Sequence, residues 1–352
     1  MVFKSGSRRH LLVALSLVGT VMTAIVVLVG AWTRLTDAGL GCPDWPGCYG
    51  RLVVPDAGVA QAHTPDSPLE PFKAWVEMFH RYIASLLGVI VLALVMLGRS
   101  RRNDAGYPWG VSLALLMAIV VQGAFGAFTV TLKLWPQVVT LHLLGGLAVM
   151  GLFLWLHLRL RRYARSISKE GEGIVSAPRR LSRWWAVAIA LLVAQLALGG
   201  WTSSNYAGMA CQGFPTCNGE WWPSMDWSEG FHLTQTVGPN YLYGQLHADA
   251  RSAIHMGHRL GALALGITLL MLIWRHWGVR QLRPILLLLF AVYGGQVLIG
   301  ALNVIWWLPL SLALVHTAGA LLMVAMMVLA VWQARGIGQP GRSSAMGECV
   351  NA

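Results

Sequence analysis

GAWTRLTDAGLGCPDWPGCYG at residues 30–50 is matched further along the chain by GGWTSSNYAGMACQGFPTCNG at residues 199–219. The two stretches align without a gap, and nine of their 21 positions are identical, including both cysteines and one proline between them. Beyond them, EMFHRY at 77–82 corresponds to HMGHRL at 255–260. An internal repeat of this kind predicts two similar structural units in one chain.

A second correspondence extends the repeat towards its end. Gln122 and His142 are 20 residues apart, and so are Gln296 and His316. The chain is therefore predicted to consist of two halves that are joined by a short charged linker. The predicted boundaries are an N-terminal half at 1–165, a linker at 166–180, a C-terminal half at 181–335 and a tail at 336–352.

The composition is that of an integral membrane protein. Of the 352 residues, 56% are hydrophobic and only 11% are charged, whereas a soluble domain carries about 25% charged residues. Roughly 20 apolar residues cross the hydrocarbon core as a helix. We therefore predict an all-α fold of eight membrane-spanning helices, arranged as two parallel-repeat four-helix bundles. The predicted spans are 11–32, 75–97, 107–129, 137–158, 184–204, 253–274, 282–305 and 308–332.

Positive charges are concentrated in alternate loops. Arginine and lysine gather near the N-terminus, at 99–102, at 159–183 and at 275–283, whereas the loops at about 33–74 and 205–252 hold few. This bias predicts a multi-pass protein of a bacterial inner membrane, with both termini in the cytoplasm and the two long loops outside. Because the net charge of +12 follows this pattern, we expect the lipid bilayer and no nucleic acid as a partner.

Four of the five cysteines fall in the two long outer loops, as Cys42, Cys48, Cys211 and Cys217, and Cys349 lies in the tail. Disulfides persist outside the cytoplasm. We therefore expect two local disulfides, one in each loop. A thiol relay and a zinc site built from the four cysteines are the alternatives.

Four histidines lie within the predicted spans, where a polar side chain is costly unless it has a partner or a function. His80 and His142 are five to six residues into the second and fourth spans, and His258 and His316 repeat this placement in the sixth and eighth. Because a helix rises about 1.5 Å per residue, the two histidines of each half have nearly the same depth. Each half is thus predicted to hold two imidazoles at one level.

Two imidazoles at one level can ligate a haem iron from opposite faces. Hydrogen bonding between helices is the simpler alternative, but its exact repetition in both halves favours haem. Copper and zinc fit less well, because no third ligand of the usual types recurs beside each pair. Arg81 and Arg259 follow the histidines directly and are candidates either for contacts with haem propionates or for lipid headgroup contacts.

The halves differ beside the first of these histidines. Glu77 precedes His80 by three residues and projects from the same face of the helix, whereas the corresponding residue of the second half is His255. A carboxylate beside a haem pocket can act as a general base or stabilise positive charge. The sequence therefore indicates chemistry in the first half and a redox centre in the second.

The chain resembles the haem A synthase family of membrane oxidases. The motifs GLGCPDWPGCYG, EMFHRY, LHLLGG, MDWSEGFH, HMGHRL and LVHTAGA carry the resemblance, in that order, over most of the chain. Cys42 and Cys48 match the cysteine pair of the family's outer loop. Many members lack a second pair, so Cys211 and Cys217 have a structural role by this comparison.

The resemblance implies an enzyme that oxidises a ring methyl of haem O to a formyl group by successive hydroxylation. It implies that His258 and His316 ligate a b-type haem as prosthetic group and that His80 and His142 hold the substrate haem O. Glu77 matches the catalytic acid position. The resemblance also implies homo-oligomers and contact with haem O synthase.

Two other functions use similar features. A di-haem b-type electron carrier, such as a quinol oxidoreductase subunit, also needs four histidines, but it usually stacks its haems across the membrane. A parallel-repeat transporter would need interrupted spans and charges near the midplane, which the predicted spans lack.

Overall fold

The computed structural model describes residues 5–168 and 181–336, and within them the predicted all-α architecture is confirmed. Eight helices are long and apolar enough to cross a membrane, as expected. The linker lies mostly, and the tail almost entirely, outside the described residues, as does Cys349. The long helices are α1 (Ser5–Leu35), α3 (Pro71–Gly98), α4 (Trp109–Thr131), α5 (Pro136–Ser168), α6 (Arg183–Ser204), α8 (Ala248–His276), α9 (Arg283–Ile305) and α10 (Leu310–Gly336).

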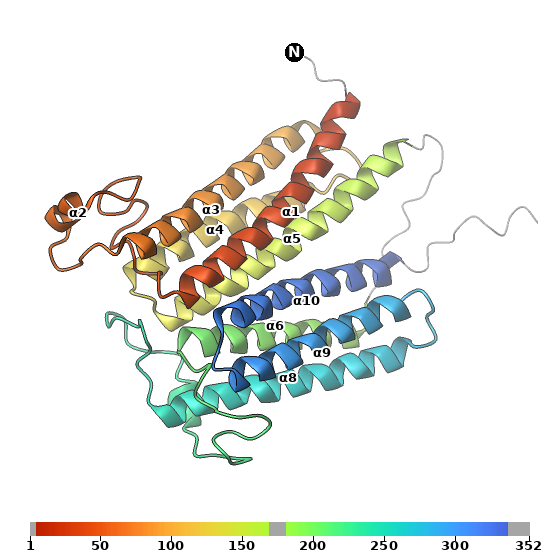
Figure 1. Cartoon of the computed structure of the whole chain (residues 1–352). Coiled ribbons are helices and arrows are strands. Elements are labelled where there is room, and N and C mark those ends of the chain that lie inside the picture. Colours follow the sequence, from red (N-terminus) through yellow and green to blue (C-terminus); the bar gives the residue numbers. More distant parts are fainter. Residues whose placement is uncertain (1–4, 169–180, 337–352) are drawn as a thin grey trace, which may run out of the picture.

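The eight long helices form two groups (Figure 1). In the first group, α1 packs on α3 and α5, and α4 packs on α3 and α5. In the second group, α8 packs on α6 and α9, and α9 packs on α10. The groups differ at one contact: α1 and α5 are packed closely along their length, whereas α6 and α10 touch only lightly.

Each group has its own apolar core. Leu12, Val91, Leu115 and Phe153 are buried in the first core. The second core is built around Trp185, Leu269, Leu286 and Met326. The two cores are separate clusters of buried residues, and a smaller buried cluster of Val27, Leu147, Met150 and Leu321 joins the two groups.

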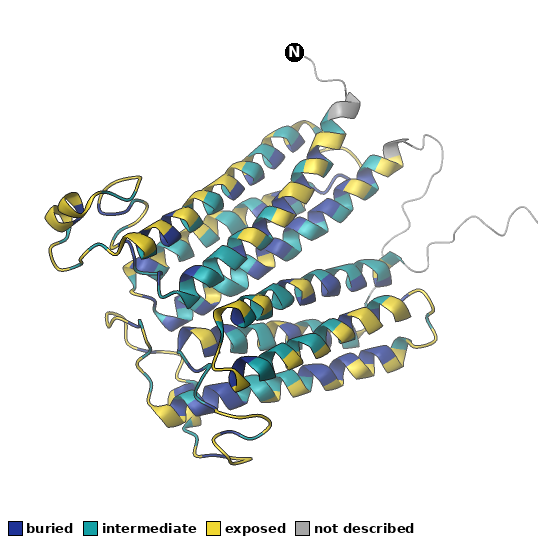
Figure 2. Cartoon of the chain, viewed as in Figure 1, coloured by how far each residue is buried: buried dark blue, intermediate teal, exposed yellow. Residues whose placement is uncertain are grey.

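Exposed positions run along the outside of both groups (Figure 2), and many of them carry large apolar side chains. Val89, Met117, Leu263, Trp274 and Leu298 are each more than half exposed. Such a surface is unfavourable in water and suits lipid tails, which are as apolar as these side chains. Helices satisfy their own backbone hydrogen bonds, which a segment inside the bilayer requires.

The two groups meet along a seam between α1 and α5 on one side and α6 and α10 on the other. At its outer end, the Arg34 guanidinium donates to the Ser203 carbonyl at 2.7 Å, and the Tyr206 hydroxyl donates to Asp37 at 3.2 Å. In the register of the repeat, position 34 corresponds to 203 and position 37 to 206. Residues close to a twofold axis contact their own counterparts in this way.

The two cysteine loops lie at the same end of the molecule, near the first turns of α3 and α8 (Figure 1). Both predicted disulfides are confirmed, Cys42 with Cys48 and Cys211 with Cys217. The second cysteine of each loop pairs with a residue three positions later through two backbone hydrogen bonds. With all four sulfurs in disulfides, no thiolate remains here for zinc.

The first cysteine loop packs directly on the backbone at the start of α3. A Cβ added to Gly41 would lie 2.5 Å from the carbonyl carbon of Lys73, and this backbone cannot move aside as a flexible side chain does. We expect Gly41→Ala to lower the free energy of unfolding by about 1–3 kcal/mol through overpacking. Thermal unfolding of the purified protein in detergent measures this.

The control is Gly58→Ala, because Gly58 lies on the short helix α2 (Ala57–His63) of the same loop with nothing within 4 Å of its added Cβ. Equal unfolding midpoints for the two variants would contradict the close packing at Gly41.

Candidate functional site

The four histidines of the predicted haem sites lie on four different helices. His80 is on α3 and His142 on α5, and His258 is on α8 and His316 on α10. All four are half-buried. The ring centres of His258 and His316 are 6.5 Å apart, with the ring planes at 78°, and His142 lies within electrostatic range of His80. The structure thus places the two histidines of each half near one another.

The spacing in the second half suits two ligands of one metal atom. Because an imidazole nitrogen lies about 2 Å from a metal that it ligates, two rings on opposite sides of one metal atom have their centres about 6 Å apart. The 6.5 Å between His258 and His316 agrees with this value. A pair of histidines that only hydrogen-bonded to each other would bring two ring nitrogens within about 3 Å, and no such bond joins these two among the described residues.

Each of the four rings lies with its Cε1 edge against a glycine of a neighbouring helix. An added Cβ on any of these glycines would be 2.9–3.5 Å from that edge. In the register of the repeat the glycines correspond in pairs, so both halves pack their histidines alike. The contacts are Gly30 of α1 with His80, Gly126 of α4 with His142, Gly199 of α6 with His258, and Gly300 of α9 with His316.

Two glutamines approach the Nδ1 atoms of these rings. Nε2 of Gln195 lies 3.1 Å from Nδ1 of His258. In the amide orientation that satisfies both of its ends, Gln122 lies 2.8 Å from Nδ1 of His142. Sequence reasoning used Gln122 only to align the halves and overlooked Gln195. For both glutamines, the feature of the sequence that could have identified them is a polar amide side chain inside an otherwise apolar span.

Nδ1 of His80 and Nδ1 of His316 are buried without a hydrogen-bond partner among the described residues. A histidine that ligates a metal through one nitrogen almost always donates its other N–H to a nearby acceptor. An amide therefore lies within hydrogen-bond distance of Nδ1 in one ring of each pair, His142 and His258, while Nδ1 of the other ring has no hydrogen-bond partner among the described residues.

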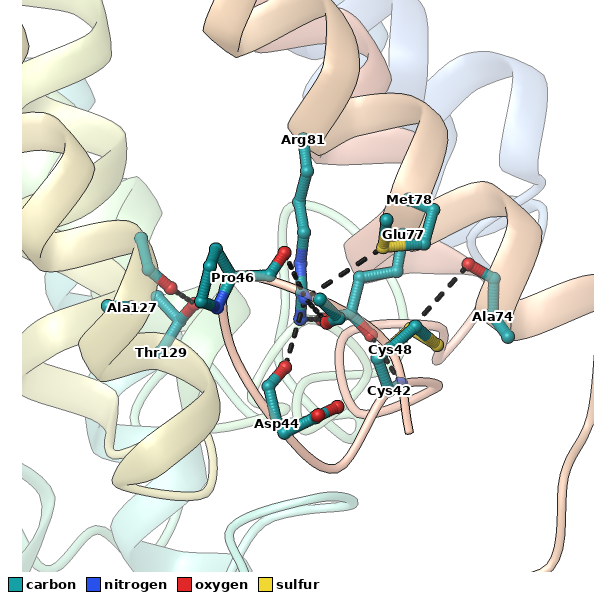
Figure 3. Close-up of polar contacts among 12 residues, drawn as sticks. Cys42, Asp44, Pro46, Cys48, Ala74, Glu77, Met78, Arg81, Ala127 and Thr129 are labelled. Carbon is teal, nitrogen blue, oxygen red and sulfur yellow. Dashed lines mark hydrogen bonds and ion pairs between the residues drawn. A yellow bond between two sulfur atoms is a disulfide. The ribbon is translucent and has the colours of Figure 1, made fainter. Parts of the chain in front are cut away.

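Glu77 is buried, with 4% of its surface exposed, and is held from two sides (Figure 3). Its Oε2 accepts the backbone N–H of Cys42 at 2.9 Å, and its Oε1 accepts from Nη2 of Arg81 at 2.5 Å. The second contact is also an ion pair between residues one helical turn apart. Because both contacts favour the anion, the carboxylate is fixed between the cysteine loop and the helix that carries His80.

Arg81 and Arg259 point into the cysteine loops and bind their backbone. Nη1 of Arg81 donates to the carbonyls of Asp44, Pro46 and Gly47. Arg259 donates to the carbonyls of Gly213, Pro215 and Thr216. These carbonyls occupy corresponding positions in the repeat. The predicted propionate contacts stay a prediction, and the observed contacts assign both guanidinium groups to holding the loops.

His255 occupies the position of Glu77 in the second half and binds the other loop by a different contact. Its Nδ1 donates to the carbonyl of Ala207 at 2.9 Å, and its side chain is buried. Positions 77 and 255 therefore both anchor an outer loop on a helix. The sequence could not show this, because the contacts join residues 35 and 48 positions apart.

The three carbonyl contacts of Arg259 predict that this side chain protects the second disulfide. Hydrogen bonds to a charged group contribute about 1.5–3 kcal/mol, so we expect Arg259→Gln to make reduction of Cys211–Cys217 by a phosphine about tenfold faster or more. Mass spectrometry after alkylation measures the rate. Arg280→Gln, at an exposed arginine between α8 and α9, is the control, and equal rates in both variants would refute the role.

The comparisons with known proteins agree with this geometry. A sequence model of the COX15-CtaA family, described as cytochrome oxidase assembly protein, matches residues 13–328. A protein from Shewanella oneidensis named heme A synthase is 43% identical over 312 residues, which are 88% of this chain and 92% of the relative. Proteins of the same name from Symbiobacterium thermophilum and Paracoccus denitrificans are 29% and 27% identical, over 86% and 90% of this chain and 89% and 85% of the relatives. The chain therefore belongs to the COX15-CtaA family of cytochrome oxidase assembly proteins.

Proposed function

We propose that this protein is a haem A synthase, a membrane oxidoreductase that oxidises a ring methyl of haem O to a formyl group by successive hydroxylation. Membership of the family and the 43% identical relative named heme A synthase support the activity. The observation that carries the proposal is the 6.5 Å spacing of the His258 and His316 rings. A glycine beside each of the four histidines supports it further.

The second half is the proposed site of the resident cofactor. A b-type haem bound there would supply a one-electron redox centre, and His258 and His316 are the residues that would hold its iron. The residues fit this role, because the spacing of the rings matches two ligands of one metal atom. Nδ1 of His316 is buried and has no hydrogen-bond partner among the described residues. No neighbouring group therefore fixes which of the two ring nitrogens carries the proton. With both histidines used to hold iron, the haem would supply electron transfer and not oxygen binding.

The first half is the proposed site of the substrate. Haem O carries a long apolar chain, and His80 and His142 lie on helices whose outer surfaces suit lipid, so the substrate has no need to enter water. Glu77 lies three residues before His80, on the same helical face. Its carboxylate is held as an anion by the Cys42 N–H and by Arg81. We propose that this fixed negative charge stabilises positive charge that develops on the substrate during oxidation of the methyl group.

The finer features of location and assembly belong to the same proposal. The alternation of charged loops supports cytoplasmic termini and cysteine loops on the outer face of a bacterial inner membrane. The seam between the groups supports the parallel-repeat arrangement of the halves. Contact with haem O synthase and assembly into homo-oligomers are proposed from the family resemblance alone.

The decisive experiment for the activity is co-expression with haem O synthase in a host that makes no haem A. The wild-type protein is expected to yield haem A, identified by chromatography of the extracted pigments. We expect Glu77→Gln to lower this yield at least tenfold and to accumulate haem O or a hydroxylated intermediate, since loss of one stabilising charge costs a few kcal/mol at the transition state.

The matched control is Glu70→Gln, because Glu70 precedes the same helix but is exposed and paired with Lys73. A wild-type protein that yields no haem A would overturn the proposed function. Normal yield from Glu77→Gln, with the function intact, would remove only the role of Glu77.

The assignment of the two sites gives a separate prediction. Protein purified from a host without haem O is expected to contain one b-type haem per chain. His258→Ala and His316→Ala should lose it, because each removes an iron ligand, whereas His80→Ala and His142→Ala should retain it. Pyridine haemochrome spectra measure the content. Two b-type haems per chain would favour an electron carrier, and protein without pigment would favour a transporter.

A further inference from the structure

Gln195 is a polar residue of α6 that the proposed activity does not yet use. Its Nε2 lies 3.1 Å from Nδ1 of His258 and donates to the backbone carbonyl of the same histidine, also at 3.1 Å. Its Oε1 is buried and has no partner among the described residues. An amide inside a membrane helix is costly when one end is unsatisfied, so the arrangement calls for an explanation.

The space for this amide is provided by a glycine. A Cβ on Gly261 would lie only 2.4 Å from Oε1 of Gln195, which is closer than any real Cβ contact allows. Gly261 follows His258 by three residues and therefore lies one helical turn further along the same face. Gln195 and Gly261 thus form a matched pair beside one face of the His258 ring.

At the corresponding place the first half has neither member of this pair; its own amide, Gln122, lies beside the other histidine, His142, in the space left by Gly145. In the register of the repeat, Gln195 corresponds to Val26 and Gly261 to Ile83. The first half therefore has two branched apolar side chains at the positions where the second half has the amide and the glycine that makes room for it. Correspondingly, Nδ1 of His80, the counterpart of His258, has no side-chain hydrogen-bond partner among the described residues, and only the backbone of Val26 is near enough to interact with the ring from this position.

We propose that Gln195, with the space left by Gly261, is a positioning residue that holds the His258 ring for ligation and so makes the second half retain its haem, while the first half releases its own. The inference rests on the proposed function, because it assumes a resident cofactor in one half and a substrate in the other. It names the residues by which two otherwise similar histidine pairs differ.

The chemistry of the amide supports this role. A histidine that ligates iron through Nε2 carries its proton on Nδ1 and needs an acceptor there. Nε2 of Gln195 now donates to the His258 carbonyl, and a turn of the amide that presents Oε1 to Nδ1 exchanges that bond for one to the ring. The resulting hydrogen bond fixes the ring and raises the basicity of the ligating nitrogen, which strengthens binding and favours the oxidised iron.

The experiment compares wild-type protein with Gln195→Val, Gly261→Ala and Gln195→Glu, purified with b-type haem bound. Haem loss is followed as transfer to excess apomyoglobin, and the midpoint potential by spectroscopic titration. We expect Gln195→Val and Gly261→Ala to lose haem about tenfold faster or more and to have more positive potentials. Gln195→Glu should shift the potential the opposite way, because a carboxylate only accepts hydrogen bonds.

The control is Gly294→Ala, since Gly294 is a glycine of the same half with nothing within 4 Å of an added Cβ. A purely structural role for Gln195 would not move the potential in opposite directions with Val and Glu. The double variant Val26→Gln with Ile83→Gly tests the reverse change in protein purified from cells that make haem O, and it is expected to slow the loss of haem O from the first half.

Two outcomes overturn the inference in distinguishable ways. If wild-type protein holds no haem that His258→Ala removes, the proposed cofactor site fails and the inference fails with it. If the haem is present but Gln195→Val and Gly261→Ala retain it as tightly as wild type, with unchanged potentials, only the inference fails.

Discussion

The functional region depends on how four imidazole rings are accommodated between apolar helices. A ring of this size needs a space that most side chains would fill, and in each case a glycine on the neighbouring helix leaves that space. The close approach of two helices then fixes both the height and the direction of the ring. For this reason the histidines are placed by the packing of whole helices.

The two halves use this packing for different purposes through few substitutions. Glu77 in the first half and His255 in the second each anchor a long loop on a helix, but only Glu77 carries a negative charge. The glutamine at position 195 brings an amide to His258. Its counterpart in the first half, Val26, brings none to His80. The groups also differ in packing, since α1 and α5 are in close contact whereas α6 and α10 barely touch. A shared framework with local differences is what the proposed division between a catalytic site and an electron-transfer site requires.

Much of the fold was predictable because its determinants are local. The spans follow from runs of apolar residues. Helical rise predicts that His258 and His316 lie at equal depth, and in the structure their rings are neighbours. The disulfides follow from where the cysteines lie. The link between Glu77 and Cys42 was not predictable, because it depends on how an irregular loop folds back on a helix.

The glutamines and arginines show the same limit of sequence reasoning. Gln195 meets a partner 63 residues away, and no periodic pattern marks that meeting. Arg81 was considered for haem or lipid contacts, and the structure instead directs it to carbonyls whose positions depend on the loop conformation. Long-range polar contacts of this kind require the folded chain.

The seam, where Arg34 meets Ser203 and Asp37 meets Tyr206, has an evolutionary consequence. Contacts between counterparts are what two identical subunits make when they dimerise. An ancestor with a single four-helix unit would have met a second copy of itself along this surface, and gene duplication with fusion would then have joined the two. Fusion would have freed each unit to diverge, which is the history that the proposed division of roles between the two halves implies.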